Sequence, residues 1–169
     1  MDSALLLRTM ESDGMRIAAL ADSVSPEQAR WKPKPDSWSI LEVVNHDVDE
    51  EREDFRTRLD ILLHRPADPW PKIDPKAWVT EKKYNERELP ESLTRFADER
   101  RASLTWLRGL TAPKWEAEVH SQFGSMRAGD MFCAWVTHDQ LHMRQLVELH
   151  RAYTEKLAEP YHLEYAGEW

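Results

Sequence analysis

Apolar residues recur at intervals of three and four positions in four long segments of this sequence. Such spacing places the apolar side chains on one face of an α-helix, and that face must be buried against another element. Four helices can satisfy one another by packing these faces into a common core. We therefore predict an all-α fold, a four-helix bundle forming one domain over residues 1–169, with helices at about residues 2–23, 40–64, 90–109 and 130–153.

Local signals mark the ends of these helices. Ser39 and Glu42 have the spacing of a capping box at the start of the second helix. Pro90 is favoured in a first helical turn, and Gly109 is typical of a helix end. Residues 66–90 are rich in proline, so we predict a long crossover between helices 2 and 3 that contains at most a short helix at residues 76–84.

Three smaller features complete the predicted fold. Gly14 interrupts the first helix and is expected to weaken or bend it. Residues 119–123 favour a short strand in the loop before the last helix. The tail is aromatic, so we expect Tyr165 and Trp169 to pack against the bundle.

Charge and cysteine content narrow the function. The chain has 31 acidic and 23 basic residues and a net charge of −8, which disfavours nucleic acid as a partner. Its single cysteine, Cys133, cannot form a disulfide within the chain, as is typical of a reducing compartment. No segment approaches the roughly 20 apolar residues of a membrane span, and the N-terminus lacks a signal peptide. We expect a cytoplasmic protein with no membrane partner.

His138 and His142 are four residues apart and therefore share one face of the last helix. Two imidazoles so placed can bind one metal ion. The alternatives are a solvated pair or core histidines bonded to carbonyl groups. Burial would favour a metal, since four ring nitrogens would need partners. The spacing of neighbouring residues indicates an inward-facing seam, which comprises Met131, Trp135, His138, His142, Gln145 and Leu149.

His46 is a weaker candidate from spacing alone. It lies on the second helix at the edge of the apolar face, with Glu42 and Glu50 one turn before and after it. A surface histidine paired with those glutamates would fit the pattern equally well. Nothing in the spacing shows that His46 reaches the other two histidines.

Two segments resemble the DinB superfamily. Residues 38–46 are similar to its W-S-x-x-E-x-x-x-H segment, and residues 138–145 to its H-D-x-x-H-x-x-Q segment. The closing residues 165–169 are also similar to tails in that family. The resemblance implies a four-helix bundle with a long crossover, in which His46, His138 and His142 share one metal site.

A site of three neutral ligands leaves open positions on a divalent ion. We expect nickel, zinc or iron, and imidazole ligands suit all three, so the ligand type does not choose among them. Characterised family members include thiol-dependent S-transferases and maleylpyruvate isomerase, which use low-molecular-weight thiols. We therefore predict a metal-dependent enzyme with a small-molecule substrate: a thiol-dependent S-transferase or isomerase, or a hydrolase. A non-catalytic metal- or ligand-binding protein is the alternative, and the acidic charge argues against a factor acting on DNA. The family also implies a homodimer.

Several residues near the histidines are candidates for supporting roles. Glu50 could accept the ring N–H of His46, hold a water or act as a general base, or it could be a solvated carboxylate. Gln145 could line the site. Arg144 could hold a substrate carboxylate or form a surface salt bridge, Asp139 is expected to be a structural or surface acid, and Trp135 a core residue or an aromatic wall. The histidines expected not to be ligands are His64, His120, His150 and His162.

Overall fold

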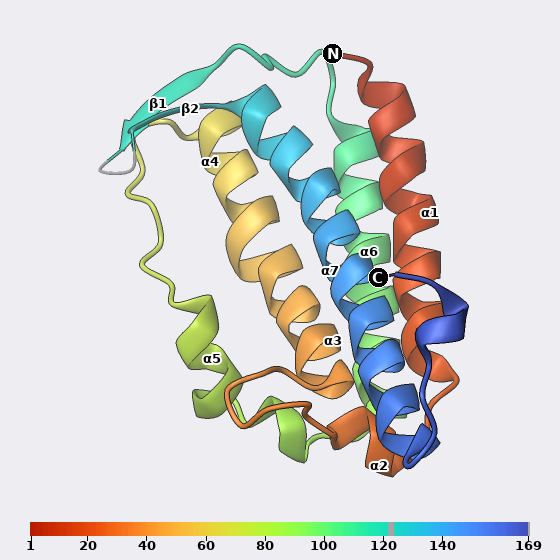
Figure 1. The fold of residues 1–169 in the computed structure, drawn as a ribbon. Helices are drawn as coiled ribbons and strands as arrows, with labels where there is room; N and C mark the ends of the chain where they lie inside the picture. Colours follow the sequence, from red (N-terminus) through yellow and green to blue (C-terminus); the bar gives the residue numbers. More distant parts are fainter. Residues whose placement is uncertain (122–123, 169) are drawn as a thin grey trace.

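The structure, a computed structural model, describes residues 1–121 and 124–168. Four long helical rods form the predicted bundle (Figure 1), so the all-α four-helix prediction is confirmed. One rod is composite, because an α-helix continues into a π-helix and then into a second α-helix. The rods are α1 (Ser3–Asp22), α3–η1–α4 (Ile40–Asp49, Glu50–Arg56 and Thr57–His64), α6 (Leu89–Gly109) and α7 (Ala128–Ala158). The short elements are α2 (Pro26–Arg30), α5 (Pro75–Glu81), η2 (Tyr84–Glu86), β1 (Glu118–Ser121), β2 (Gly124–Arg127) and η3 (Glu164–Ala166).

The crossover follows from the directions of the rods. In Figure 1, α1 and α7 run downward, whereas the composite rod and α6 run upward. Both α1 and the composite rod contact α6 and α7. Because the composite rod and α6 are parallel neighbours, the chain must return along the outside of the bundle between them, and α5 lies on this return.

Two apolar clusters fill the bundle, one toward α2 and one toward the β-hairpin. Each rod supplies residues to both clusters, and each places a buried charged residue between them. The four charged residues are Asp13 on α1, Glu51 on η1, Arg100 on α6 and Asp139 on α7. We call this set the polar layer.

Gly14 lies inside α1, which continues without a break from Ser3 to Asp22. A Cβ atom at this position would lie 3.2 Å from Cγ of Arg100, which is tighter than ordinary packing. The missing side chain therefore leaves room for the arginine stem to cross α1 and reach the polar layer.

The predicted strand is present as β1, but residues 122 and 123 lie outside the described part of the chain. The sequence did not predict β2, which pairs with β1 in antiparallel fashion. The predicted helix at residues 76–84 corresponds to α5 and η2, and the short helix α2 at residues 26–30 was not predicted.

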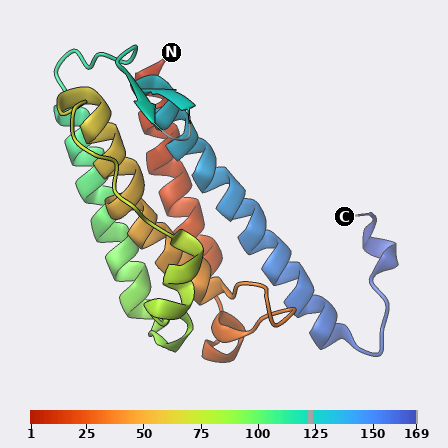
Figure 2. The same cartoon turned by 90° about the vertical axis from the view of Figure 1, so that its left-hand side faces the viewer.

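The prediction for the tail is wrong for Tyr165, whose side chain is fully exposed. After α7 the chain turns away from the bundle and ends in η3 (Figure 2). The surface of α7 beside it carries the charged residues Arg151 and Glu155. Trp169 lies outside the described residues. Within the described residues, no helix combines the length and the apolar character needed to cross a bilayer.

Candidate metal centre

His46 of α3 and His138 and His142 of α7 lie together in the structure. One ring nitrogen of each lies within 4.8 Å of those of the other two. The Nε2 atoms of His138 and His142 are 3.1 Å apart. Donors about 2.0–2.1 Å from a tetrahedral ion are about 3.4 Å from one another, so small side-chain movements would fit this group to a metal ion. We call these residues the histidine triad.

His46 is not a surface histidine paired with Glu42 and Glu50, because its side chain is buried. All residues of α3 are buried, since α2, α5, η2 and α6 enclose the helix in addition to α7. A polar residue on this helix therefore needs a partner from another element. The pairs that meet this need are Glu42 with Lys32, Asn45 with Ser92 and Arg87, and Asp49 with Tyr84 and Lys82.

Gln145 orients the ring of His142. Its Oε1 atom lies 2.9 Å from Nδ1 of His142, and a carbonyl oxygen can only accept a hydrogen bond. The proton of the neutral imidazole therefore sits on Nδ1, and Nε2 presents a lone pair to His138. This arrangement is typical of histidines that bind metals, whose second nitrogen is held by an outer partner.

Three buried atoms of His46 and its neighbour Asp47 lack hydrogen-bond partners among the described residues. They are Nδ1 of His46 and both carboxylate oxygens of Asp47. Oδ1 of Asp47 lies 3.5 Å from Nε2 of His142. A single proton can bridge His138 and His142, but it leaves the other atoms unsatisfied. A cation at the triad fits this set of donors better.

Burial keeps the histidines neutral. It lowers the pKa of His46 to about 3, with a further contribution from His142. Burial, His142, His46 and Arg100 together lower the pKa of His138 to about 2. The pKa of His142 is also lowered by burial. All three rings therefore have a lone pair available for a metal ion at neutral pH.

Trp38 covers the triad from the segment before α3. Its ring is 4.7 Å from that of His46 and lies parallel to that of His142, at 6.4 Å between ring centroids. Trp38 is part of the family motif, but the sequence alone assigned it no role. The motif could have indicated one, because it places the tryptophan at a fixed number of residues from His46.

Comparison with known proteins identifies the family and a similar fold. Residues 9–146 match the DinB superfamily. The chain belongs to this superfamily. Among solved structures it is similar to YfiT from Bacillus subtilis, a probable metal-dependent hydrolase with an unusual four-helix bundle topology. The two are 17% identical with a TM-score of 0.78, covering 89% of this chain and 87% of that one, a likeness that shows the fold. No curated protein matches the sequence.

In this DinB superfamily protein, the predicted second helix widens into the π-helix η1 one turn after His46. Single π-turns inside α-helices often occur at functional sites. The wide turn buries Glu50, Glu51 and Asp54 on the same short segment. The solvated alternative for Glu50 is therefore wrong, and Glu50 hydrogen-bonds to Asp54. Burial and Asp54 raise the pKa of Glu50 to about 8, so this pair retains a proton at neutral pH.

The pH dependence of stability tests this environment. The folded protein holds the Glu50 proton up to a pKa of about 8, whereas the ordinary value is 4.5. The stability that this proton contributes is fully present below the ordinary pKa of 4.5. It is lost as the pH rises through the folded-state pKa of about 8. We expect the melting temperature of metal-free Glu50→Gln to rise relative to wild type between about pH 5 and pH 8. Glu53→Gln, on the exposed side of η1, is the control, and a constant difference for Glu50→Gln would contradict the assignment.

Arg100 connects the polar layer to the triad. Its guanidinium donates to both oxygens of Asp139, at 2.5 and 2.7 Å, and to the carbonyl oxygen of Met10, and it pairs with Glu51. Asp139 follows His138 directly, which confirms its expected structural role. The ion pair therefore fixes the rotation of α7 and directs both of its histidines toward α3.

Arg144 and Trp135 have partners outside the triad. Arg144 forms a surface ion pair with Glu148, and Trp135 is a core residue that stacks on Phe55. Two histidines have local partners outside the triad, namely His64 with Asp60 and His150 with the carbonyl of Leu20. His120 and His162 are exposed.

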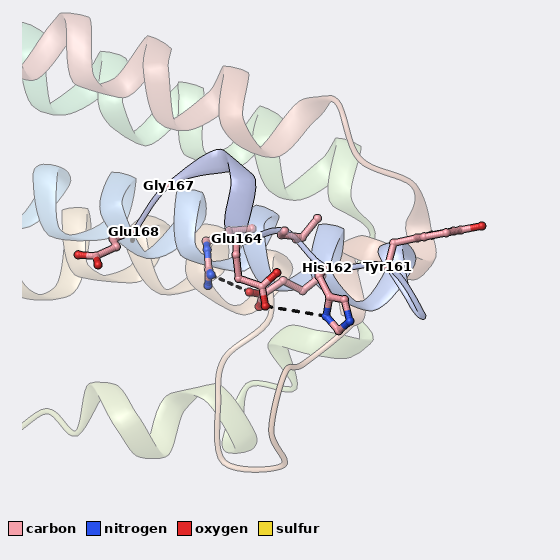
Figure 3. Close-up of a pocket in the computed structure, with 8 residues that line it drawn as sticks. Tyr161, His162, Glu164, Gly167 and Glu168 are labelled. Carbon is pink, nitrogen blue, oxygen red and sulfur yellow. Dashed lines mark ion pairs between the residues drawn. The ribbon is translucent and has the colours of Figure 1, made fainter.

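Two cavities differ in their relation to the triad. One of about 520 Å³ borders Trp38 and Gln145, both of which contact His142, and Lys34 and Leu149 also line it. Another of about 920 Å³ lies between the tail and α7 (Figure 3), where Arg151 pairs with Glu155 and His162 with Glu164. Arg151 is roughly 14 Å along the helix from His142, so this second cavity does not serve the triad.

Proposed function

We propose that this chain is a metal-dependent enzyme that acts on a small molecule, with one divalent ion bound by His46, His138 and His142. The proposal rests mainly on one observation. The lone pair on Nε2 of His142 faces Nε2 of His138 at 3.1 Å, beside a buried carboxylate that has no donor. The histidines are neutral, so the site can take nickel, zinc or iron.

A divalent ion with an open position supplies Lewis-acid activation of a water or a thiol. The chain's own residues would do the rest. Gln145 orients His142, and Trp38 excludes water from one side of the triad. The hydrogen-bonded pair of Glu50 and Asp54 carries a proton at neutral pH and is the candidate general acid and base. The cavity beside Trp38 and Gln145 is the candidate substrate site.

Hydrolysis is the reaction class with the most support, because the similar structure YfiT is a probable metal-dependent hydrolase. Thiol-dependent S-transfer or isomerisation is the second candidate, since the family resemblance implies it and a low-molecular-weight thiol would be its cofactor. The same resemblance predicts a homodimer, and the composition predicts a cytoplasmic location.

Metal removal followed by reconstitution tests the proposal. The stripped protein, reloaded separately with nickel, zinc and ferrous iron, would be assayed against ester and amide substrates and against thiol–electrophile pairs. We expect turnover that depends on the metal, in one of the two panels. A metal-dependent rise in melting temperature with no turnover in either panel would favour the non-catalytic alternative.

Gln145→Leu should weaken metal binding, because Nδ1 of His142 then loses its acceptor. Loss of such an outer partner typically costs 10–100-fold in affinity. Gln28→Leu is a matched control, since Gln28 hydrogen-bonds to His150 outside the triad. Competition with a chromophoric chelator measures both variants. Equal affinities would show that Gln145 does not orient a ligand.

A further inference from the structure

Asp47 is a buried acid of α3 whose carboxylate has no hydrogen-bond donor among the described residues. Its side chain is 3% exposed, and neither oxygen accepts a hydrogen bond from any described residue. The other buried acids of this segment have partners: Asp49 binds Tyr84 and Lys82, and Glu51, whose oxygens also lack hydrogen bonds, forms an ion pair with Arg100. A buried carboxylate without a donor is costly, so such a residue calls for an explanation.

No protein cation is free to neutralise Asp47 within the described part of the chain. Arg100 is the only buried cation there, and its donors are engaged by Asp139, Glu51 and a backbone carbonyl. The carboxyl groups of Asp47, Asp139 and Glu51 and the guanidinium of Arg100 interact electrostatically. Arg100 already pairs with two of these carboxylates, so the group has more acidic than basic side chains. A divalent ion would balance this excess of acidic groups.

The direction of Asp47 indicates where such an ion would lie. Oδ1 is 3.5 Å from Nε2 of His142, the atom that presents its lone pair to His138. Two electron-rich atoms at this separation repel each other unless a proton or a cation lies near both. Donor atoms around one metal ion have similar separations.

We propose that Asp47 is the anionic determinant of cation binding at the triad: its carboxylate lies beside the three histidine ligands and balances the charge of the ion, while the ion keeps its open position. This inference rests on the proposed function, because it requires an ion at the triad. The negative charge of Asp47, which lies beside His142, balances part of the positive charge of the ion. It therefore favours divalent over monovalent cations. Sequence spacing alone did not reveal Asp47, since it follows His46 directly and an adjacent residue points about 100° away on a helix.

The proposal predicts opposite effects of one substitution on two properties. Asp47→Asn keeps the size of the side chain, removes the unpaired charge and adds an N–H that can donate to Nε2 of His142. The metal-free variant should therefore melt at the same temperature as wild type or above it. Its affinity for a divalent ion should fall 10–100-fold, as for other residues that support a metal.

The experiment uses the full-length protein stripped of metal. Zinc affinity would be measured by competition with a chromophoric chelator, and the melting temperature without metal by circular dichroism. Asp49→Asn is the matched control, because Asp49 is buried on the same helix but has its own donors. The control should melt at a lower temperature and retain the wild-type zinc affinity within about threefold.

The outcomes separate this inference from the proposed function. If wild type binds zinc and Asp47→Asn binds it equally well, Asp47 is not a determinant of the site and only this inference fails. If Asp47→Asn is less stable than wild type without metal, Asp47 has a structural role and the inference also fails. If wild type binds no divalent ion, the proposed function fails together with it.

Discussion

His142→Ala should leave the purified protein without bound metal. The ring of His142 lies 4.9 Å from that of His46 and 4.4 Å from that of His138, and Gln145 fixes its tautomer. Two remaining imidazoles are too few for the three protein ligands of a typical open metal site. Elemental analysis should give close to one equivalent of metal in wild type and less than about a tenth in the variant. Any metal-dependent turnover should disappear with the metal.

His64→Ala is the control, because His64 is half exposed and pairs only with Asp60 among the described residues. Its metal content should equal that of wild type. Full occupancy in His142→Ala would show that the metal binds elsewhere and would remove the basis of the site assignment. Circular dichroism should show that the variant remains helical.

Arg100→Met should cause the largest loss of stability among substitutions in the polar layer. It removes the cation that pairs with Glu51 and Asp139 and leaves two buried carboxylates without their donors. Breaking a buried ion pair from one side typically costs about 3–5 kcal/mol. For a domain of this size that corresponds to a fall in melting temperature of roughly 6–20 °C. Thermal and urea unfolding both measure the effect.

Arg101→Met provides the comparison, since Arg101 lies next along α6 and its ion pair with Asp98 is exposed. Its cost should be at most about 1 kcal/mol. Adding Glu51→Gln and Asp139→Asn to Arg100→Met should recover part of the lost stability, because no unpaired charge then remains. Equal losses from Arg100→Met and Arg101→Met would contradict the account of the polar layer.

The fold could be predicted because its information is local. Apolar spacing located the four rods, and Ser39 and Glu42 form the capping box that starts the composite rod. Proline content located the crossover. The π-helix could not be predicted in this way, because residues 50–56 continue a helical pattern and only their tertiary environment selects the wider turn.

The site was predictable in part. The spacing of His138 and His142 placed them on one inward face, whereas the placement of His46 required the family resemblance. Periodicity put His46 at the edge of the apolar face, but α3 is enclosed on all sides by elements distant in sequence. The same enclosure buries Asp47 and Glu50. The sequence indicated that Arg100 is special, because it is a charged residue in the apolar stripe of its helix. The sequence did not indicate its partners Glu51 and Asp139.

X-ray absorption spectroscopy of the zinc-loaded protein reports the atoms bound to the metal. We expect three imidazole nitrogens at about 2.0–2.1 Å, with the remaining ligands being oxygen. His142→Ala, loaded under the same conditions, should lose this signature. A spectrum that requires sulfur, or that fits with no more than one imidazole, would contradict the histidine triad as the metal site.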